Sequence, residues 1–298
     1  MQNKEWLYYT DGKGVPCFSG NISSQLWQVA GENFKRGYTF SYDQLGRMKD
    51  AIYGEGDNMN EHSNRYTERV KEYTMNGGIR KLERFGRKSD GKYGKIDNLR
   101  YYYSGMQLDS IKEDALPVTY VGAFDFKSNT IRADSNQYSY YPNGSLKWDA
   151  NKGVTLIKYD KFNHISKVQF HNGNCINYTY TLTGEKLSAI YQTAVPNISV
   201  PIGHNYSLAA NELLSIDTIQ YVGDFVFENG RLSKYLFEGG FISFTNHLPS
   251  YHYYTCDHLG NIRAVVDENG IAEQINHYYP YGAIYSDAGK NDAMQRYK

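Results

Sequence analysis

Apolar and polar residues alternate strictly along a stretch in the second half of the chain. Ile176, Tyr178, Tyr180 and Leu182 are separated from one another by single polar residues. Successive side chains of a β-strand point to opposite faces, so a period of two places these apolar side chains on one face. The pattern predicts a strand with one face buried and the other in contact with solvent.

The same pattern recurs around regularly placed glycine or asparagine residues. At least six segments share it: YTFSYDQLGRMKDAIY, LRYYYSGMQLDSI, NQYSYYPNGSLKWD, LIKYDKFNHISKVQF, INYTYTLTGEKLSAIY and IQYVGDFVFENGRLSKYLF. The turn residues Gly144, Asn163 and Gly184 lie 19 and 21 residues apart, which is the length of a two-stranded unit with its connections. We therefore expect an all-β fold built from an array of antiparallel β-hairpins.

The residues around the turns predict two local features. Asn-Gly pairs at 142–145, 171–174 and 228–231 favour primed hairpin turns, because both residues tolerate a positive φ. After most turns the apolar positions step by three and then by two, as in Met48, Ala51 and Tyr53. Strict alternation does not allow a step of three. Either the first apolar residue closes the turn, or a β-bulge follows it at the same place in every unit.

Two segments depart from the repeat. Residues 54–95 open with polar and close with charged residues, so we expect a loop-rich section around one weak hairpin at Asn76 to Gly78. Residues 195–218 contain two prolines and then a candidate short helix with Ser207 as N-cap, which predicts a linker. The expected organisation is an N-terminal flanking segment over 1–35, a hairpin array over 36–194, the linker, and a C-terminal portion over 219–298.

Composition narrows the classes of function. The chain has 30 Tyr and 28 Gly, which suits half-buried strands joined by tight turns. Its 32 Lys and Arg balance 32 Asp and Glu, which argues against electrostatic binding to nucleic acid or to anionic membranes. No window approaches the roughly 20 apolar residues of a membrane-spanning helix, and the first residues lack the apolar centre of a signal peptide. Three cysteines without CxxC spacing predict neither a disulfide framework nor a zinc knuckle.

From Tyr251 the sequence YHYYTCDHLGNIRAVVDENGIAEQINHYYPYG resembles the opening of the RHS repeat-associated core domain. Upstream, Tyr-Asp pairs that are followed three residues later by Gly or Asn resemble the YD repeats of the same family. The HYYPYG ending and a preceding GGFISF segment are similar to the form common in Bacteroidetes. The resemblance implies structural roles for Tyr42, Asp43, Gly46, Tyr159, Asp160, Asp257, His258, Leu259, Gly260, Arg263, Gly270, Pro280 and Gly282.

The resemblance also implies an architecture and a biological setting. The hairpins would form a curved ribbon or partial shell, and full-length relatives enclose or display a C-terminal toxin or other effector in secreted or contact-dependent systems. The expected location is extracellular or at the cell surface. The expected partners are flanking repeats or an effector domain of a longer polypeptide, and cell-surface glycans. Residues 219–298 would be core-associated hairpins, truncated before the end of the core.

One group of residues has the chemistry of metal ligands. It consists of His247, His252, Cys256 and His258, with His277 nearby. A zinc ion needs about four such groups converging at bonding distance. A strand would place His252 and Cys256 on one face but out of contact, so we predict no metal site.

Three aspartates invite a catalytic interpretation. Asp43, Asp160 and Asp257 could be acid/base carboxylates, but each lies two to three residues before a turn Gly or Asn. Turn capping explains an aspartate that recurs in every unit better than catalysis does. The sequence also has no GxSxG elbow, Walker loop or GxGxxG fingerprint. We therefore predict a non-enzymatic protein with no catalytic residues and no cofactor.

The tryptophans leave a second function open. Trp6, Trp27 and Trp148 could stack on sugar rings, although cross-strand packing is the simpler explanation for them. The leading hypothesis is a structural segment of a shell. The alternative is a carbohydrate-binding or cell-surface adhesion module.

Overall fold

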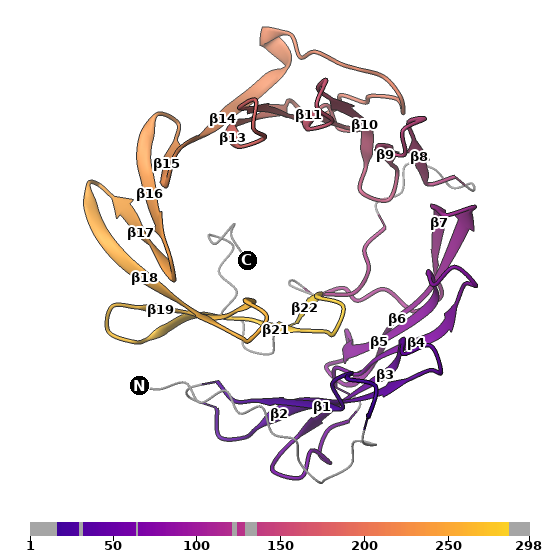
Figure 1. Ribbon diagram of the computed structural model, residues 1–298. Helices are drawn as coiled ribbons and strands as arrows, with labels where there is room; N and C mark the ends of the chain where they lie inside the picture. Colours follow the sequence, from indigo (N-terminus) through magenta and orange to yellow (C-terminus); the bar gives the residue numbers. More distant parts are fainter. Residues whose placement is uncertain (1–16, 30–31, 64, 121–123, 129–135, 286–298) are drawn as a thin grey trace. The chain divides into compact units, whose positions relative to one another are not determined.

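The computed structural model describes residues 17–29, 32–63, 65–120, 124–128 and 136–285. Within these residues the chain is nearly all β and its strands pair antiparallel, which confirms the predicted array of hairpins. Within each sheet, strands that are consecutive in the sequence lie side by side (Figure 1). The chain divides into two compact units, and neither unit is continuous in the sequence.

The first unit combines Met1–Tyr102, Ile111–Phe126 and Tyr253–Lys298. Its main sheet runs in the order β1-β2-β3-β4-β5-β6, and its C-terminal strands form the pairs β19–β20 and β21–β22. The strands are β1 (Ser24–Trp27), β2 (Arg36–Tyr42), β3 (Met48–Glu55), β4 (Glu68–Tyr73), β5 (Ile79–Arg87), β6 (Tyr93–Ser104), β19 (Ile262–Asp267), β20 (Ala272–Ile275), β21 (His277–Tyr278) and β22 (Ile284–Tyr285).

The second unit combines Tyr103–Ser110 with Lys127–His252. Strands β8 to β17 pair in sequence order, each with the next. They are β8 (Tyr138–Tyr140), β9 (Leu146–Asp149), β10 (Val154–Tyr159), β11 (Ile165–Phe170), β12 (Cys175–Tyr180), β13 (Lys186–Ala194), β14 (Leu213–Val222), β15 (Phe225–Glu228), β16 (Arg231–Phe237) and β17 (Gly240–Thr245). Three strands have residues in both units: β6, β7 (Gln107–Glu113) and β18 (Leu248–Cys256).

A β-bulge follows the first residue after the turn, in hairpins of both units. In the β2–β3 hairpin Tyr42 pairs with Met48 but Ser41 pairs with Asp50, so Lys49 is the additional residue. The same register shift follows the turns of β8–β9, β10–β11, β12–β13, β15–β16 and β19–β20. The extra residue restores the apolar face after the turn. Of the two explanations for the step of three, the bulge is the correct one.

Most of the described turns contain one residue with a positive φ, whereas the predicted primed turns would contain two. In the turn from Tyr141 to Ser145, Gly144 has a φ of +87° and donates its amide to the Tyr141 carbonyl at 2.8 Å. Asn143 does not have a positive φ, and its side chain accepts a hydrogen bond from the Ser145 amide at 3.1 Å. This is a type I turn closed by a left-handed residue. Pro142 fits its first central position because proline fixes φ near −65°.

The predicted primed turns are therefore wrong at two of three sites. At 171–174, as at 142–145, only the glycine has a positive φ. Asn229 and Gly230 both have one, at +49° and +76°, and Glu228 pairs directly with Arg231 across them. The primed turn is confirmed at that site alone.

Residues 54–95 are not a loop-rich section. They contain β4, β5 and the start of β6, and the hairpin predicted around Asn76 to Gly78 is present. Val70, Leu82 and Leu99 from these strands form a buried apolar cluster. The charged residues that suggested loops alternate with these apolar residues along the same strands. Their polarity therefore indicates the second face of a strand and not a loop.

The segment before β14 packs on the second unit. Val200 is buried, and its amide donates to the His171 carbonyl at 2.7 Å. Lys167 donates to the Tyr206 carbonyl at 2.6 Å. The helix expected from Ser207 is reduced to one 3-10 turn, η1 (Ala210–Glu212). The stretch expected to be a linker is therefore tied to β11 and the turn that follows it.

The left-handed turn residue provides a test of this turn geometry. Gly144→Ala should lower the free energy of unfolding by about 1–2 kcal/mol, because an L-residue is strained at positive φ. A Cβ at this position would meet no atom within 4 Å, so the loss reports backbone strain alone. Gly144→Asn should lose less than Gly144→Ala, because asparagine tolerates positive φ, as Asn163 does at the equivalent position with a φ of +66°. Urea unfolding followed by circular dichroism measures both, and equal losses in the two variants would contradict the prediction.

Candidate functional site

The aspartates of the Tyr-Asp pairs cap turns. Asp43 Oδ1 accepts hydrogen bonds from the amides of Leu45 and Arg47, both at 2.9 Å, and Oδ2 accepts one from Arg47 Nε at 2.7 Å. Asp160 and Asp257 accept equivalent bonds from the amides two and four residues later, at 2.8 to 3.0 Å. Each carboxylate therefore accepts hydrogen bonds from the backbone of its own turn.

The tyrosines of the same pairs tie neighbouring segments together. The Tyr42 hydroxyl donates to the Ile22 carbonyl at 2.7 Å, and the Tyr159 hydroxyl donates to the Leu146 carbonyl at 2.9 Å. The glycine or asparagine three residues after the aspartate supplies the left-handed residue of the turn, with a φ of +75° at Gly46. Each member of the motif thus has a structural contact.

The Asp257 turn connects to the aromatic core of the first unit. Arg263 Nε donates to Asp257 Oδ2 at 3.0 Å, and its guanidinium lies 5.1 Å from the ring centres of both Trp27 and Tyr278. Burial alone would raise the pKa of Asp257, but hydrogen bonds from Asn261 and the charge of Arg263 lower it. The buried carboxylate is held as an anion that orients Arg263 over two rings.

The tip of this turn is exposed. His258 and Leu259 occupy its two central positions, and Leu259 is 71% exposed. Gly260 has a φ of +83°, and Gly270 has one of +77° in the next turn, which Asp267 caps. Leu259 thus donates its backbone amide to Asp257 while its side chain is exposed.

The hairpin that carries the Tyr-Tyr-Pro-Tyr-Gly sequence docks on strands from the N-terminal half of the chain. The Tyr279 hydroxyl donates to the Phe85 carbonyl at 2.7 Å, although the two residues are 194 positions apart. The Tyr281 amide donates to Glu68 Oε2 at 3.0 Å. Pro280 lies in the turn. Gly282 closes the turn with a φ of +84°, and its amide donates a hydrogen bond to the Tyr279 carbonyl at 2.8 Å. We call this element, His277 to Tyr285, the C-terminal hairpin.

The C-terminal hairpin completes a buried cluster of aromatic residues. Tyr285 stacks on Tyr66 with ring centres 3.9 Å apart and meets Tyr53 edge-on at 6.2 Å. Tyr53 in turn meets Tyr38 edge-on at 5.7 Å, across a directly paired position of β2 and β3. Aromatic pairs in these geometries add to the free energy of burial. The buried members of the cluster are Trp27, Val29, Tyr38, Ala51, Tyr53, Tyr66, Tyr279 and Tyr285.

A polar network borders this cluster. Trp27 Nε1 donates to His277 Nδ1 at 3.2 Å, and His277 Nε2 lies 3.5 Å from Glu32 Oε1. Burial would raise the pKa of Glu32, but hydrogen bonds from His277 and Arg36 bring it down to about 2. Burial lowers the pKa of His277, against the opposing effect of Glu32. His277 is therefore held neutral, with Nδ1 as the acceptor for Trp27.

A second polar group lies beneath the turn of the C-terminal hairpin. Glu68 is 1% exposed, and Oε1 has no hydrogen-bond partner, whereas Oε2 accepts the Tyr281 amide. Arg84, which pairs with Glu68 across β4 and β5, forms an ion pair with Asp97 at 2.7 Å. Burial raises the pKa of Glu68 to about 7, and the neighbouring Asp97 adds to the shift while the Tyr281 amide and Arg84 oppose it.

The candidate metal ligands have separate structural environments. His252 stacks on Phe241 with ring centres 4.3 Å apart and bonds Ser243 at 2.8 Å. His277 is buried against Trp27, and Cys256 is exposed. Across the described residues, no three His, Cys, Asp or Glu side chains are arranged to hold a metal ion. In the same residues, no helix is long and apolar enough to cross a membrane.

Two of the three tryptophans offered for sugar stacking are buried. Trp27 is 5% exposed and Trp148 is 8% exposed, so neither presents a ring face to a ligand. Trp27 is the last residue of β1 and Trp148 lies within β9, and both side chains are packed in the protein, which is the role that competed with stacking. Trp6 lies outside the described residues. The stacking hypothesis is therefore wrong for Trp27 and Trp148.

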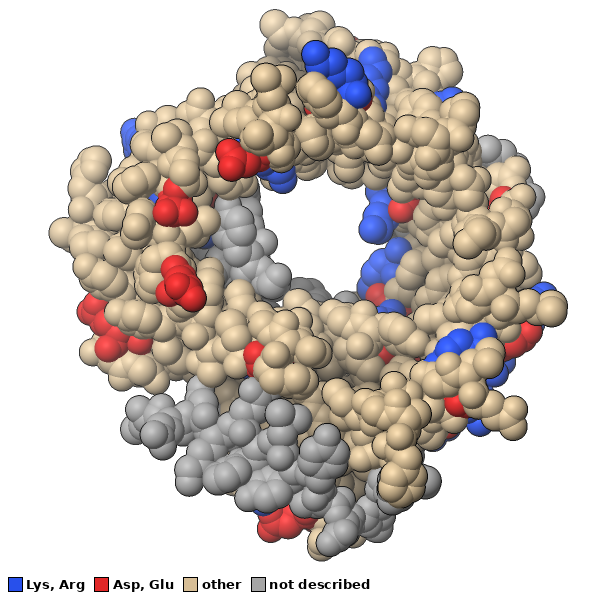
Figure 2. Space-filling view, in the orientation of Figure 1, with Lys and Arg blue, Asp and Glu red and all other residues tan. Residues whose placement is uncertain are grey.

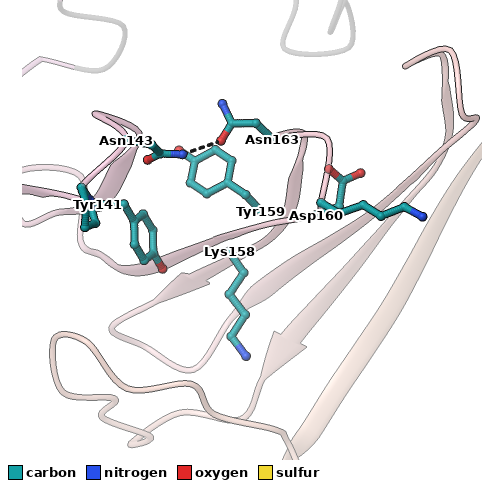
Figure 3. A pocket seen from close by; sticks show the side chains of 8 residues that line it. Tyr141, Asn143, Lys158, Tyr159, Asp160 and Asn163 are labelled. Atoms are coloured by element: carbon teal, nitrogen blue, oxygen red, sulfur yellow. Dashed lines mark hydrogen bonds between the residues drawn. The ribbon is translucent and has the colours of Figure 1, made fainter.

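A hollow in the second unit lies between two successive turns (Figure 3). The rings of Tyr141 and Tyr159 meet edge-on at its side with centres 6.0 Å apart. Asn143 Nδ2 donates to Asn163 Oδ1 at 3.2 Å across the turns, and the Tyr141 hydroxyl donates to the Ile157 carbonyl at 2.9 Å. These groups hold one hairpin to the next, so the hollow follows from the stacking of turns.

Charged side chains on the described part of one face are dispersed (Figure 2). Figure 2 shows acidic and basic side chains in small groups on the described surface of the face in view. Many of the described charges form ion pairs, such as Lys35 with Asp57 at 2.9 Å and Arg100 with Asp114 at 2.9 Å. On the described part of this face, the distribution agrees with the balanced composition and forms no extended basic surface.

The sequence did not reveal the residues that receive the C-terminal hairpin. Glu32, Arg36, Glu68 and Arg84 were assigned to loops or not singled out. One signal was available: Glu68 is two positions from Val70, and in a strand both lie on the same face. A carboxylate on a buried strand face needs a hydrogen-bond or ion-pair partner from another segment, so it is a candidate for a long-range contact.

Comparison with known proteins gives only distant structural similarity. No protein-family model and no curated protein matches the sequence. The crystal structure of TcdB2-TccC3-TEV matches with a TM-score of 0.34 and 13% identity, over 89% of this chain and 16% of that one. The Photorhabdus luminescens Tc holotoxin pore matches with a TM-score of 0.30 and 12% identity, over 91% of this chain and 18% of that one. The chain thus spans less than a fifth of either structure.

Truncation of a buried tyrosine tests the importance of hairpin docking. Tyr279→Ala should destabilise the first unit by about 3–5 kcal/mol, the range for removing a buried large aromatic side chain. Tyr279 is 2% exposed, and the change also leaves the Phe85 carbonyl without its donor. Leu259→Ala, at an exposed position of the neighbouring motif, should change stability by less than about 0.5 kcal/mol. Urea unfolding of the two variants checks this, and a loss below 1 kcal/mol at Tyr279, on the order of a surface change, would show that docking contributes little.

Proposed function

We propose that this chain is a non-enzymatic structural segment of an RHS/YD-repeat protein, and that it forms part of a β-shell. The shell would enclose or display a C-terminal effector in a secreted or contact-dependent system. The role is that of a scaffold whose partners are flanking repeats or the effector domain of a longer polypeptide. An extracellular or cell-surface location belongs to the same proposal.

The docked C-terminal hairpin is the observation that carries the proposal. Tyr279 and Tyr281 bond to residues 194 and 213 positions earlier, within one compact unit. A segment that must confine a payload needs the ends of its hairpin array to be fastened, because stacked hairpins otherwise leave terminal edges unpaired. The buried tyrosine cluster supplies such a fastening.

The structural contacts of the polar residues support a non-enzymatic role. Asp43, Asp160 and Asp257 repeat one capping arrangement, whereas a catalytic group is needed only once. The neutral His277 is buried and is enclosed between Trp27 and Glu32. These residues serve the fold, which favours a scaffold over a hydrolase.

The carbohydrate-binding alternative loses most of its support. Its candidate platforms were Trp6, Trp27 and Trp148, and the last two are buried. The tyrosines around the hollow in Figure 3 direct their hydroxyls to backbone carbonyls. We therefore do not retain glycans among the proposed partners.

Protection from proteolysis tests enclosure. The test uses a flexible peptide with a single protease site, fused after Lys298. The peptide should be cleaved at least about tenfold more slowly in the folded wild-type fusion than in the Tyr279→Ala fusion. The reason is that a loss of about 1.4 kcal/mol in docking free energy already changes accessibility tenfold. The Leu259→Ala fusion is the matched control and should behave as wild type. Cleavage at the same rate in all three fusions would contradict enclosure by this segment and leave display of the effector as the scaffold's role.

A further inference from the structure

Glu68 has a buried position that suits a neutral carboxyl group better than a carboxylate. Its side chain lies under the turn of the C-terminal hairpin and is 1% exposed. One oxygen accepts the Tyr281 amide at 3.0 Å, and the other has no hydrogen-bond partner. An ionised carboxylate with an unpaired buried oxygen is costly, whereas the neutral acid has less charge to solvate.

The only cation close to Glu68 among the described residues that influence it is already paired. Arg84 lies opposite Glu68 on β5, but its Nε forms an ion pair with Asp97 Oδ2 at 2.7 Å. Asp97 is fully buried and also accepts the Phe126 amide at 2.6 Å. Two buried carboxyl groups therefore share one guanidinium, and Asp97 has the closer contact. One negative charge is left uncompensated whenever both are ionised.

We propose that Glu68 is a proton-operated latch for the C-terminal hairpin: the hairpin is held while Glu68 is protonated and is loosened when Glu68 ionises. Tyr281 is the point of contact, because its amide bonds the carboxyl group directly. The proposal goes beyond the scaffold role, since it concerns when the hairpin is seated and not what the sheets enclose.

The direction of the pH dependence follows from the burial of the acid. Burial raises the pKa of Glu68 from its usual 4.5 to about 7 when the hairpin is docked. A raised pKa means that the contribution of Glu68 to docking is fully present below pH 4.5 and is lost as the pH rises through 7. The latch is therefore closed in mild acid and weakened above neutrality.

The arginine and tyrosine groups around Glu68 stay in one charge state across this range, whereas Asp97 shares the upward pKa shift. From β3 the paired residue is Ala51, and from β5 it is Arg84, whose pKa is raised. The Tyr279 and Tyr281 hydroxyls of the hairpin have raised pKa values and remain neutral. Asp97 on β6 shows the same upward direction as Glu68, because burial outweighs its pairing with Arg84.

Exchange of the Tyr281 amide proton tests the latch on the whole chain. In wild type its protection factor, corrected for intrinsic exchange, should fall roughly ten- to a hundred-fold between pH 5 and pH 8. In Glu68→Gln the side chain keeps an acceptor for this amide but cannot ionise, so the protection factor should change less than about threefold over the same range. A wild-type profile that is flat, or a Glu68→Gln profile that falls as wild type does, would overturn the proposal.

Glu72→Gln is the matched control. Glu72 lies on the same strand but its side chain is 53% exposed and pairs with Arg80 at the surface. This variant should follow the wild-type profile, and a flat profile here would show that the change at Glu68 is not specific.

Direct titration of Glu68 covers the case in which Glu68→Gln does not fold. In wild type with carbon-13-labelled glutamate, the Glu68 carboxyl resonance should titrate with a midpoint near pH 7. A midpoint at or below about pH 5 would mean that Glu68 is ionised in the docked state at neutral pH, and the latch would be wrong.

Discussion

A single antiparallel hairpin has an apolar face that it cannot cover by itself, and the rest of this structure depends on how that face is buried. Tyrosine is well suited to the task. In the first unit its rings pack across paired strands, as Tyr38 and Tyr53 do, while hydroxyls reach backbone carbonyls on other segments. Tyr38 bonds the Tyr66 carbonyl at 3.0 Å, and Tyr279 bonds the Phe85 carbonyl at 2.7 Å. One residue type thus supplies apolar area and a directional tie between segments.

Repeated packing requires every hairpin to present the same face, which the turn and the bulge ensure together. The capping aspartate and the left-handed residue set the turn, and the bulge then shifts the second strand by one residue. Without that shift the apolar positions after the turn would point to the opposite face. Aspartate therefore recurs because turn geometry recurs, and its repetition separates it from a catalytic residue.

The sequence predicted what local patterns determine and missed what distant contacts determine. Alternation and turn residues were enough for the hairpin array, and the step after Met48 indicated a bulge as one of two explanations. Residues 54–95 were misjudged because pairs such as Arg84 with Asp97 bury charge on strand faces, where polarity was taken to mean exposure. The docking of the C-terminal hairpin could not be predicted, because no local pattern relates Tyr281 to Glu68 across 213 positions.

Two ionisable groups at opposite parts of the C-terminal hairpin respond to pH in opposite senses. Burial lowers the pKa of His277, so its contribution is fully present above pH 6.5 and declines as the pH falls below that value. Burial raises the pKa of Glu68, so its contribution declines as the pH rises. Docking through both groups is therefore favoured within a limited range around mild acidity. Replacing these buried ionisable groups with apolar side chains would remove the pH limit on docking. The tyrosine cluster therefore provides the strength of the contact, while His277 and Glu68 determine the pH range in which it forms.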